Sequence, residues 1–237
     1  LRDNFLRIGD RPMFLTGTQQ FWISQSYRTS SPLTIARDFR DMRDYGVRLS
    51  RSFMMWKIRG DKEERRFRDM MVYLAHKYGV VMYHEGTGSF PPQSDDLAKE
   101  KERARFLAER YGGLPLFLVD HRNEPSLPLA DTPRQNARFR EFVKRKYKGT
   151  PPYEDIRSGK LSNEWGDLRS YDLRTLASEQ TARWARVLSE EMRAIHPELI
   201  TSVGFLQEVP PSRFSDPLRA SDGLQLMNRH FYGPQRI

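Results

Sequence analysis

The chain has 237 residues and a net charge of +9, with 38% hydrophobic and 30% charged residues, a balance typical of a globular domain with a wet surface. It contains no cysteine, which excludes disulfides and thiolate metal sites. No apolar run approaches the roughly 20 residues that a membrane-spanning helix needs, and the N-terminal residues contain no signal-peptide core. The sequence therefore indicates no membrane partner and assigns no compartment.

The positive charge is distributed along the chain, because the 40 Lys and Arg residues are interleaved with 31 Asp and Glu residues. A protein that binds nucleic acid would gather its basic residues on one surface. Segments such as RDFRDMRDYG and KEKERARFLAER instead alternate the two signs at helical spacing, which favours solvated helix faces with local ion pairs. We therefore expect no nucleic-acid partner, and a basic barrel that binds nucleic acid is the weakest alternative.

The elements predicted along the chain alternate between short apolar strands and amphipathic helices. A hairpin around Gly9 and Asp10 precedes the first strand, and Ser31 and Pro32 predict the start of a helix that stops at Gly46. The parallel strands are expected at 13–17, 47–53, 79–84, 116–122, 200–205 and 224–230. Further helices are expected at 62–79, 95–113, 132–149 and 172–197.

Strict alternation of strands and helices predicts βα units around a parallel sheet, either doubly wound or closed as a (β/α)8 TIM barrel. The GxGxxG sequence that a dinucleotide-binding sheet carries after its first strand is absent. Polar residues instead follow the strands, and in a barrel all these ends converge on the face that carries the site. We therefore predict one barrel domain over 1–237 with about six βα units, in which 148–172 is an irregular excursion. The strand-end residues are Gln19, Arg51, His84, Asn123, Glu124, His230 and Tyr232.

The segment LFLVDHRNEP is an apolar run that ends in Asn123, Glu124 and Pro125. In an ordinary turn, the proline would close the strand and the asparagine would cap a neighbouring group. Alternatively, a buried strand ends in this way where its end forms the floor of a pocket.

The order of these segments resembles glycoside hydrolase clan A, the retaining (β/α)8 glycosidases, and families 5 and 42 in particular. RIGDRPMFLTGTQQFW is similar to the opening hairpin and first strand of the clan, and FRDMRDYGVRLSRSFMMW to its first helix and second strand. YLAHKYGVVMYHEG is similar to the third strand, RYGGLPLFLVDHRNEP to the fourth and LQLMNRHFYG to the sixth. The resemblance covers the chain from about residue 5 to its end and implies an enzyme that cleaves β-glycosidic bonds in a carbohydrate substrate.

The resemblance implies a role for each strand-end residue. Glu124 would be the general acid that protonates the departing oxygen and later the base that activates water. Asn123 would contact the sugar 2-hydroxyl, and Arg51 would orient the nucleophilic carboxylate. Sugar rings also stack on aromatic side chains, whereas Trp184 lies within an amphipathic helix and is expected in the core. The other expected substrate-binding residues are His84, His230, Tyr232, Trp56 and Trp22.

The spacing of His, Asp and Glu matches no metal-binding motif, and we expect neither a metal nor another cofactor. A retaining mechanism needs a second carboxylate, which in the clan follows a seventh strand. This chain stops at Ile237, just after the predicted sixth strand. We therefore expect an incomplete catalytic domain, completed by about two further βα units or by a second chain, and inactive alone. A carbohydrate-binding relative without catalysis is the alternative function.

Overall fold

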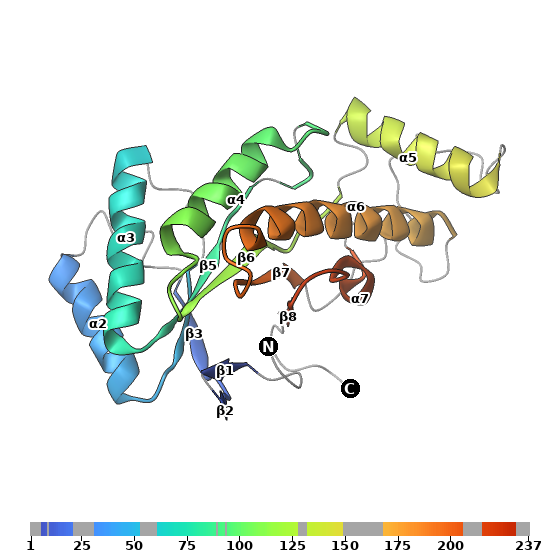
Figure 1. Ribbon diagram of the computed structural model, residues 1–237. Coiled ribbons are helices and arrows are strands. Elements are labelled where there is room, and N and C mark those ends of the chain that lie inside the picture. Colours follow the sequence, from blue (N-terminus) through green and yellow to red (C-terminus); the bar gives the residue numbers. More distant parts are fainter. Residues whose placement is uncertain are drawn as a thin grey trace. The chain divides into compact units, whose positions relative to one another are not determined.

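The computed structural model describes residues 6–8, 10–20, 31–52, 61–88, 90–92, 94–127, 132–148, 168–205 and 215–230 (Figure 1). Its strands are β1 (Arg7–Ile8), β2 (Arg11–Pro12), β3 (Gly17–Gln20), β4 (Leu49–Ser52), β5 (Val81–Glu85), β6 (Phe117–Asn123), β7 (Ile200–Phe205) and β8 (Leu226–Arg229). Its helices are α2 (Pro32–Asp44), α3 (Asp61–Tyr78), α4 (Ala98–Tyr111), α5 (Pro133–Tyr147), α6 (Leu168–Arg193) and α7 (Pro217–Ala220).

Strands β3 to β8 form one six-stranded sheet in chain order, β3-β4-β5-β6-β7-β8. The pairs β3–β4, β4–β5, β5–β6 and β7–β8 are parallel, and helices alternate with the strands along the chain. β1 and β2 form a separate antiparallel pair, which confirms the predicted hairpin. An uninterrupted parallel order is that of a (β/α)8 barrel, of which this chain contains about six units.

The chain divides into two compact units. The first comprises Leu1–Gly88, Ala98–His121 and Leu188–Thr201, and the second comprises Ser89–Leu97, Arg122–Val187 and Ser202–Ile237. Strands β6 and β7 and helix α6 each contribute residues to both units.

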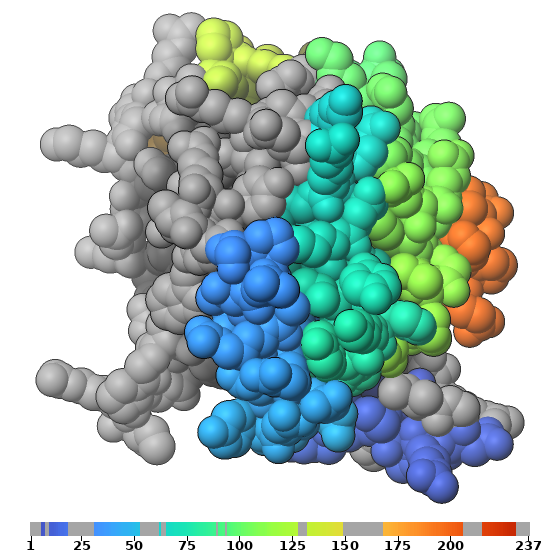
Figure 2. Space-filling model, turned by 90° about the vertical axis from the view of Figure 1, so that its left-hand side faces the viewer, coloured from blue at the N-terminus to red at the C-terminus, as the bar shows by residue number. Residues whose placement is uncertain are grey.

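In the first unit, α2 shows how local sequence defines a helix. The Ser31 hydroxyl accepts a hydrogen bond from the backbone nitrogen of Thr34 at 3.3 Å, and Pro32 opens the helix as predicted. Ile35, Phe39 and Met42 recur at helical spacing and are buried. α2 packs against α3, which packs against β5, and the two helices lie side by side on the face shown in Figure 2.

In the second unit, α5 and the first half of α6 enclose an apolar core. The Thr132 hydroxyl caps α5 by accepting a hydrogen bond from the backbone nitrogen of Gln135 at 3.2 Å. Phe139 and Phe142 stack with ring centroids 6.3 Å apart. The buried members of this core are Leu127, Phe139, Phe142, Val143, Leu173, Leu176 and Ala177.

Five of the six predicted parallel strands match the structure closely, and the first does not. β3 spans Gly17–Gln20 rather than 13–17, and Phe14 is 91% exposed. The apolar residues before Gly17 suggested a strand, but pairing with β4 begins only at Gly17, opposite Leu49. α6 begins at Leu168, inside the predicted excursion, and residues 149–167 of that segment lie outside the described residues.

Within the described ranges, no helix combines the length and the apolar content that crossing a membrane requires.

Candidate active site

The end of β6 turns sharply at Glu124. The first five residues of β6 are buried, and Glu124 then takes a φ of 48°, in the left-handed region that a residue with a side chain rarely adopts. The backbone nitrogen of Glu124 donates a hydrogen bond to the carbonyl of Gly204 in β7 at 2.7 Å. The buried Pro125 follows. This backbone conformation ends the strand and fixes the direction in which the carboxylate leaves it.

The carboxylate of Glu124 contacts His230, a residue 106 positions further along the chain. His230 Nδ1 and Glu124 Oε1 are 2.7 Å apart, and the two side chains are 9% and 22% exposed, respectively. The backbone nitrogen of His230 donates to the carbonyl of Phe205 at 2.8 Å, which fixes the residue just after β8. The structure thus brings together two predicted site residues, each at the carboxyl end of a parallel strand.

Asn228 contacts the second ring nitrogen of His230. The Asn228 Nδ2 atom lies 3.4 Å from His230 Nε2. An ionised carboxylate only accepts hydrogen bonds, so in the contact with Glu124 Oε1 the donor is His230 Nδ1. His230 therefore donates to Glu124 Oε1 and fixes the orientation of the carboxyl group. Asn123, which directly precedes Glu124 in the sequence, is the last residue of β6 and is half-buried.

Arg51 lies in the first unit and is paired with Asp120. Its Nε and Nη2 atoms donate to the same carboxylate oxygen of Asp120 at 3.1 Å and 2.5 Å, and both side chains are buried. Burial opposes the charge on Arg51, but the attraction and hydrogen bond of Asp120 outweigh it, so the pKa of Arg51 lies above its ordinary value. Arg51 is therefore a permanent buried cation with a fixed orientation.

Further groups surround this ion pair on the same face of the sheet. The guanidinium carbon of Arg51 lies 5.7 Å from the centre of the Tyr83 ring, and the carboxylate of Glu85 is buried nearby in β5. Tyr83 pairs with Arg51 in the strand register, and Glu85 pairs with Asp120. Side chains in equivalent positions of parallel strands point to the same side of a sheet. These residues form one buried polar cluster on strands β4, β5 and β6.

His84 points to the opposite face of β5 from Tyr83. It is fully buried, its Nδ1 lies 3.3 Å from the Ser52 hydroxyl, and its ring stacks on Phe117 with centroids 5.9 Å apart. Burial and the positive charge of Arg68 hold the pKa of His84 well below its ordinary value. His84 is therefore a neutral residue packed within the first unit, and its predicted contact with a sugar stays a prediction.

The remaining predictions have different outcomes. Trp184 is 1% exposed, which confirms its predicted place in the core. Trp22, Trp56 and Tyr232 lie outside the described residues. Within the ranges that the structure describes, no three His, Asp or Glu side chains are close enough to hold a metal ion.

Sequence reasoning did not select Asp120 or Asn228. Asp120 is a charged residue inside a buried strand, and such a residue must have a partner, which was the available signal. Asn228 and His230 lie two positions apart in an extended segment and therefore share a face, which was the signal for Asn228.

Comparison with models of protein families, and with curated proteins, finds no match to this chain. Solved structures do match. A beta-galactosidase from the psychrophilic Marinomonas ef1 aligns over 92% of this chain and 41% of its own, with a TM-score of 0.66 and 15% identity. A catalytic mutant of Gan42B, a GH42 beta-galactosidase from G. stearothermophilus, aligns over 100% of this chain and 41% of its own, with a TM-score of 0.66 and 14% identity.

A second group of matches comes from another glycosidase family. The structure of GH5_18 from Streptomyces cattleya in complex with GlcNAc aligns over 92% of this chain and 51% of its own, with a TM-score of 0.56 and 13% identity. Both families belong to clan A, so the resemblance read from the sequence is confirmed at the level of the fold. The chain has the fold of part of a clan A glycosidase barrel, and it spans about half or less of the length of these structures.

Proposed function

We propose that this chain is part of a glycoside hydrolase that cleaves β-glycosidic bonds with retention of configuration, with Glu124 as the general acid and base. The observation that supports this role most directly is the 2.7 Å contact between Glu124 Oε1 and His230 Nδ1. It joins the ends of two parallel strands in a fold shared with beta-galactosidases, and barrel enzymes carry their sites at that end of the strands.

The hydrogen bond from His230 gives the two carboxyl oxygens of Glu124 different roles. Because Oε1 accepts from Nδ1, a proton on the carboxyl group is carried by Oε2. In the first step, Oε2–H protonates the glycosidic oxygen as the bond to the sugar breaks. In the second step, the resulting carboxylate removes a proton from the water that attacks the anomeric carbon.

The same mechanism needs a nucleophilic carboxylate about 5 Å from Glu124. The resemblance assigns that residue to the end of a seventh strand, beyond β8 or on another chain. Arg51 would orient it and Asn123 would hold the sugar 2-hydroxyl, while His84, Tyr232, Trp22 and Trp56 would complete the sugar site. These roles follow from the resemblance and remain proposals.

Substitution of Glu124 in the protein that carries this chain tests the proposed role. Glu124→Gln keeps the shape of the side chain but cannot donate a proton. It should lower the turnover of aryl β-glycosides with poor leaving groups by about 10²- to 10⁴-fold, and spare those whose leaving group needs no proton. Glu102→Gln, an exposed position on α4, is the matched control. Equal losses on both substrate types would contradict the acid/base role.

A panel of aryl β-galactosides, β-mannosides and β-glucosides would identify the sugar. Sugar binding by the wild-type protein without turnover of any of them would instead favour a carbohydrate-binding relative that has lost catalysis.

A further inference from the structure

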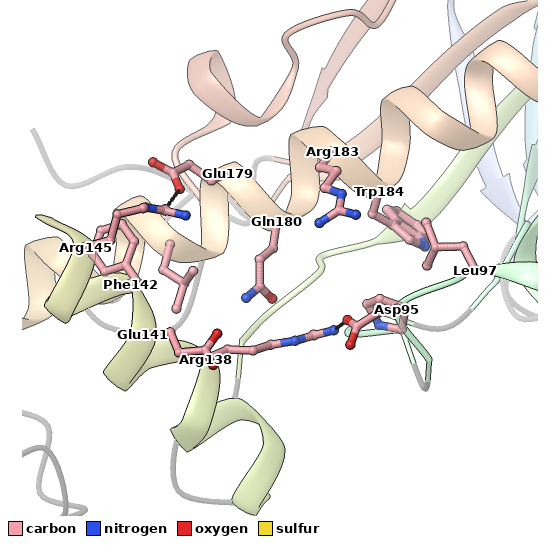
Figure 3. A pocket seen from close by; sticks show the side chains of 12 residues that line it. Asp95, Leu97, Arg138, Glu141, Phe142, Arg145, Glu179, Gln180, Arg183 and Trp184 are labelled. Carbon is pink, nitrogen blue, oxygen red and sulfur yellow. Dashed lines mark hydrogen bonds and ion pairs between the residues drawn. The ribbon is translucent and has the colours of Figure 1, made fainter.

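A cleft lies in the second unit, and neither Glu124 nor His230 is among the residues that line it. It is a cleft of about 410 Å³ between α5, α6 and the segment that precedes α4 (Figure 3). This volume is in the range of small-ligand sites. The lining residues are Pro92, Asp95, Leu97, Arg138, Glu141, Phe142, Arg145, Leu176, Glu179, Gln180, Arg183 and Trp184.

Positive charge is in excess at the end of the cleft formed by Asp95. Arg138 and Arg134 both bind Oδ1 of Asp95, the second at 2.9 Å. Burial, together with the positive charge of Arg183, lowers the pKa of Arg138. Among the described residues, no carboxylate pairs with Arg183. Within the described part of the cleft lining, this end therefore carries the guanidinium groups of Arg138 and Arg183 and one carboxylate, that of Asp95.

The opposite end of the cleft has the balancing negative charge. Arg145 on α5 pairs with Glu179 on α6 at 3.1 Å, and Glu141 lies one turn before Arg145. Figure 3 shows this pair at one end of the cleft and the Arg138–Asp95 pair at the other. An anion that entered the cleft would therefore be attracted toward Arg183 and Arg138 and repelled from the Glu141 end.

Gln180 adds a requirement for a hydrogen-bond donor. It lies three residues before Arg183, on the same face of α6, and both side chains point into the cleft (Figure 3). Its Oε1 atom is buried and accepts no hydrogen bond within the part of the chain that the structure describes. A buried acceptor without a donor is costly, and a ligand hydroxyl would remove that cost.

Apolar side chains form the wall between these polar groups. Leu97, Leu176 and Phe142 line the cleft, and the Trp184 ring packs on Phe90 with centroids 5.5 Å apart. These side chains are almost fully buried, so they support the floor of the cleft. The cleft therefore combines an anion-attracting end with a buried hydroxyl acceptor.

We propose that this cleft binds a small hydroxylated carboxylate of the sugar-acid class, with its carboxylate toward Arg183 and Arg138 and a hydroxyl donating to Gln180 Oε1. An inorganic anion would satisfy the arginines but not Gln180, and a neutral sugar would satisfy Gln180 but not the arginines. The site does not involve Glu124, so the proposal stands independently of the proposed hydrolase activity.

Calorimetric titration of the protein with D-glucuronate, D-glucose and inorganic phosphate tests this assignment. We expect glucuronate to bind more tightly than either of the others, with an affinity that falls as salt is added. No measurable glucuronate binding would overturn the proposal. Phosphate binding as tight as that of glucuronate would overturn the role of Gln180, and equal binding of glucose would overturn the role of the arginines.

Two variants locate the binding. Arg183→Gln should weaken glucuronate binding about tenfold or more, since it removes a charge-assisted contact. Gln180→Leu should weaken glucuronate binding while leaving the thermal midpoint unchanged or higher, because it removes a buried acceptor without a donor. Arg103→Gln, an exposed position on α4, is the control that should bind normally. Undiminished binding by Arg183→Gln would place the ligand elsewhere and refute the proposal.

Discussion

Arg51 donates two hydrogen bonds to a single oxygen of Asp120, 69 residues away in the sequence, and both side chains are buried. Removal of either partner leaves a buried charge uncompensated. We therefore expect Asp120→Ala to lower the free energy of unfolding by about 3–5 kcal/mol, measured by urea denaturation. Asp222→Asn, which breaks an exposed pair with Arg186, should cost less than about 1 kcal/mol. Equal effects of the two substitutions would mean that the Arg51 pair contributes no more than a surface contact.

The contact between His230 and Glu124 should influence turnover more than stability. His230→Ala removes a donor to the carboxylate and leaves the general acid without a fixed orientation. We expect kcat/KM for substrates with poor leaving groups to fall about 10- to 100-fold, from the loss of one charge-assisted hydrogen bond. Substrates whose leaving group needs no proton should be spared, which a purely structural role would not produce. Equal losses of His230→Ala on both kinds of substrate would argue against coupling of the two residues.

Two buried histidines predict that the fold loses stability in acid. His121 is fully buried with its ring nitrogens 2.8 Å from the Thr87 hydroxyl and 2.9 Å from the Ser189 hydroxyl, and burial lowers its pKa to about 3. Burial likewise holds the pKa of His84 well below 6.5. Because both folded-state values lie below the unfolded value, the unfolded chain binds protons first as the pH falls. Stability is therefore intact above about pH 6.5 and is lost progressively below it.

At about pH 5.5, protonation of His121 in the unfolded chain should have lowered the free energy of unfolding by about 1 kcal/mol relative to neutral pH, and His84 should act in the same direction. Urea denaturation at several pH values in this range measures how steeply the free energy of unfolding falls with pH. His121→Gln should reduce the slope, whereas His76→Gln, at an exposed position on α3, should leave it unchanged. Stability that stays constant between neutral pH and pH 5.5 would show that the two rings are not held neutral by burial.

The core between α5 and α6 should be sensitive to loss of volume. Leu173 is fully buried among Phe139, Phe142 and Leu176. We expect Leu173→Ala to cost about 2–5 kcal/mol of unfolding free energy, because it removes buried methyl groups and leaves a cavity. Leu168→Ala, on the same helix but 43% exposed, is the control and should cost much less. Similar values for the two variants would mean that this core does not support the second unit.

Much of the fold could be predicted from the sequence because its determinants are local. Ser31 and Pro32 define the start of α2 through one hydrogen bond and one fixed backbone angle, and the apolar spacing that follows determines which face is buried. Strands β4 to β8 lie close to their predicted places for the same reason. β3 was misplaced because its residues are not distinguished by apolar character. Their pairing with Leu49–Ser52 of β4 defines the strand.

The position of Glu124 at the end of β6 could likewise be predicted from the sequence, because an apolar run that ends in Asn-Glu-Pro marks where a buried strand meets a site. Its partner could not, since Glu124 and His230 are 106 positions apart and no local signal joins them. The same holds for Arg51 and Asp120. In a strand, a shift of one residue reverses the face on which every side chain lies, and register is decided by the neighbouring strands. The sequence determined which residues end the strands, and only the tertiary structure decided which of them meet and that His84 is buried on the face opposite Tyr83.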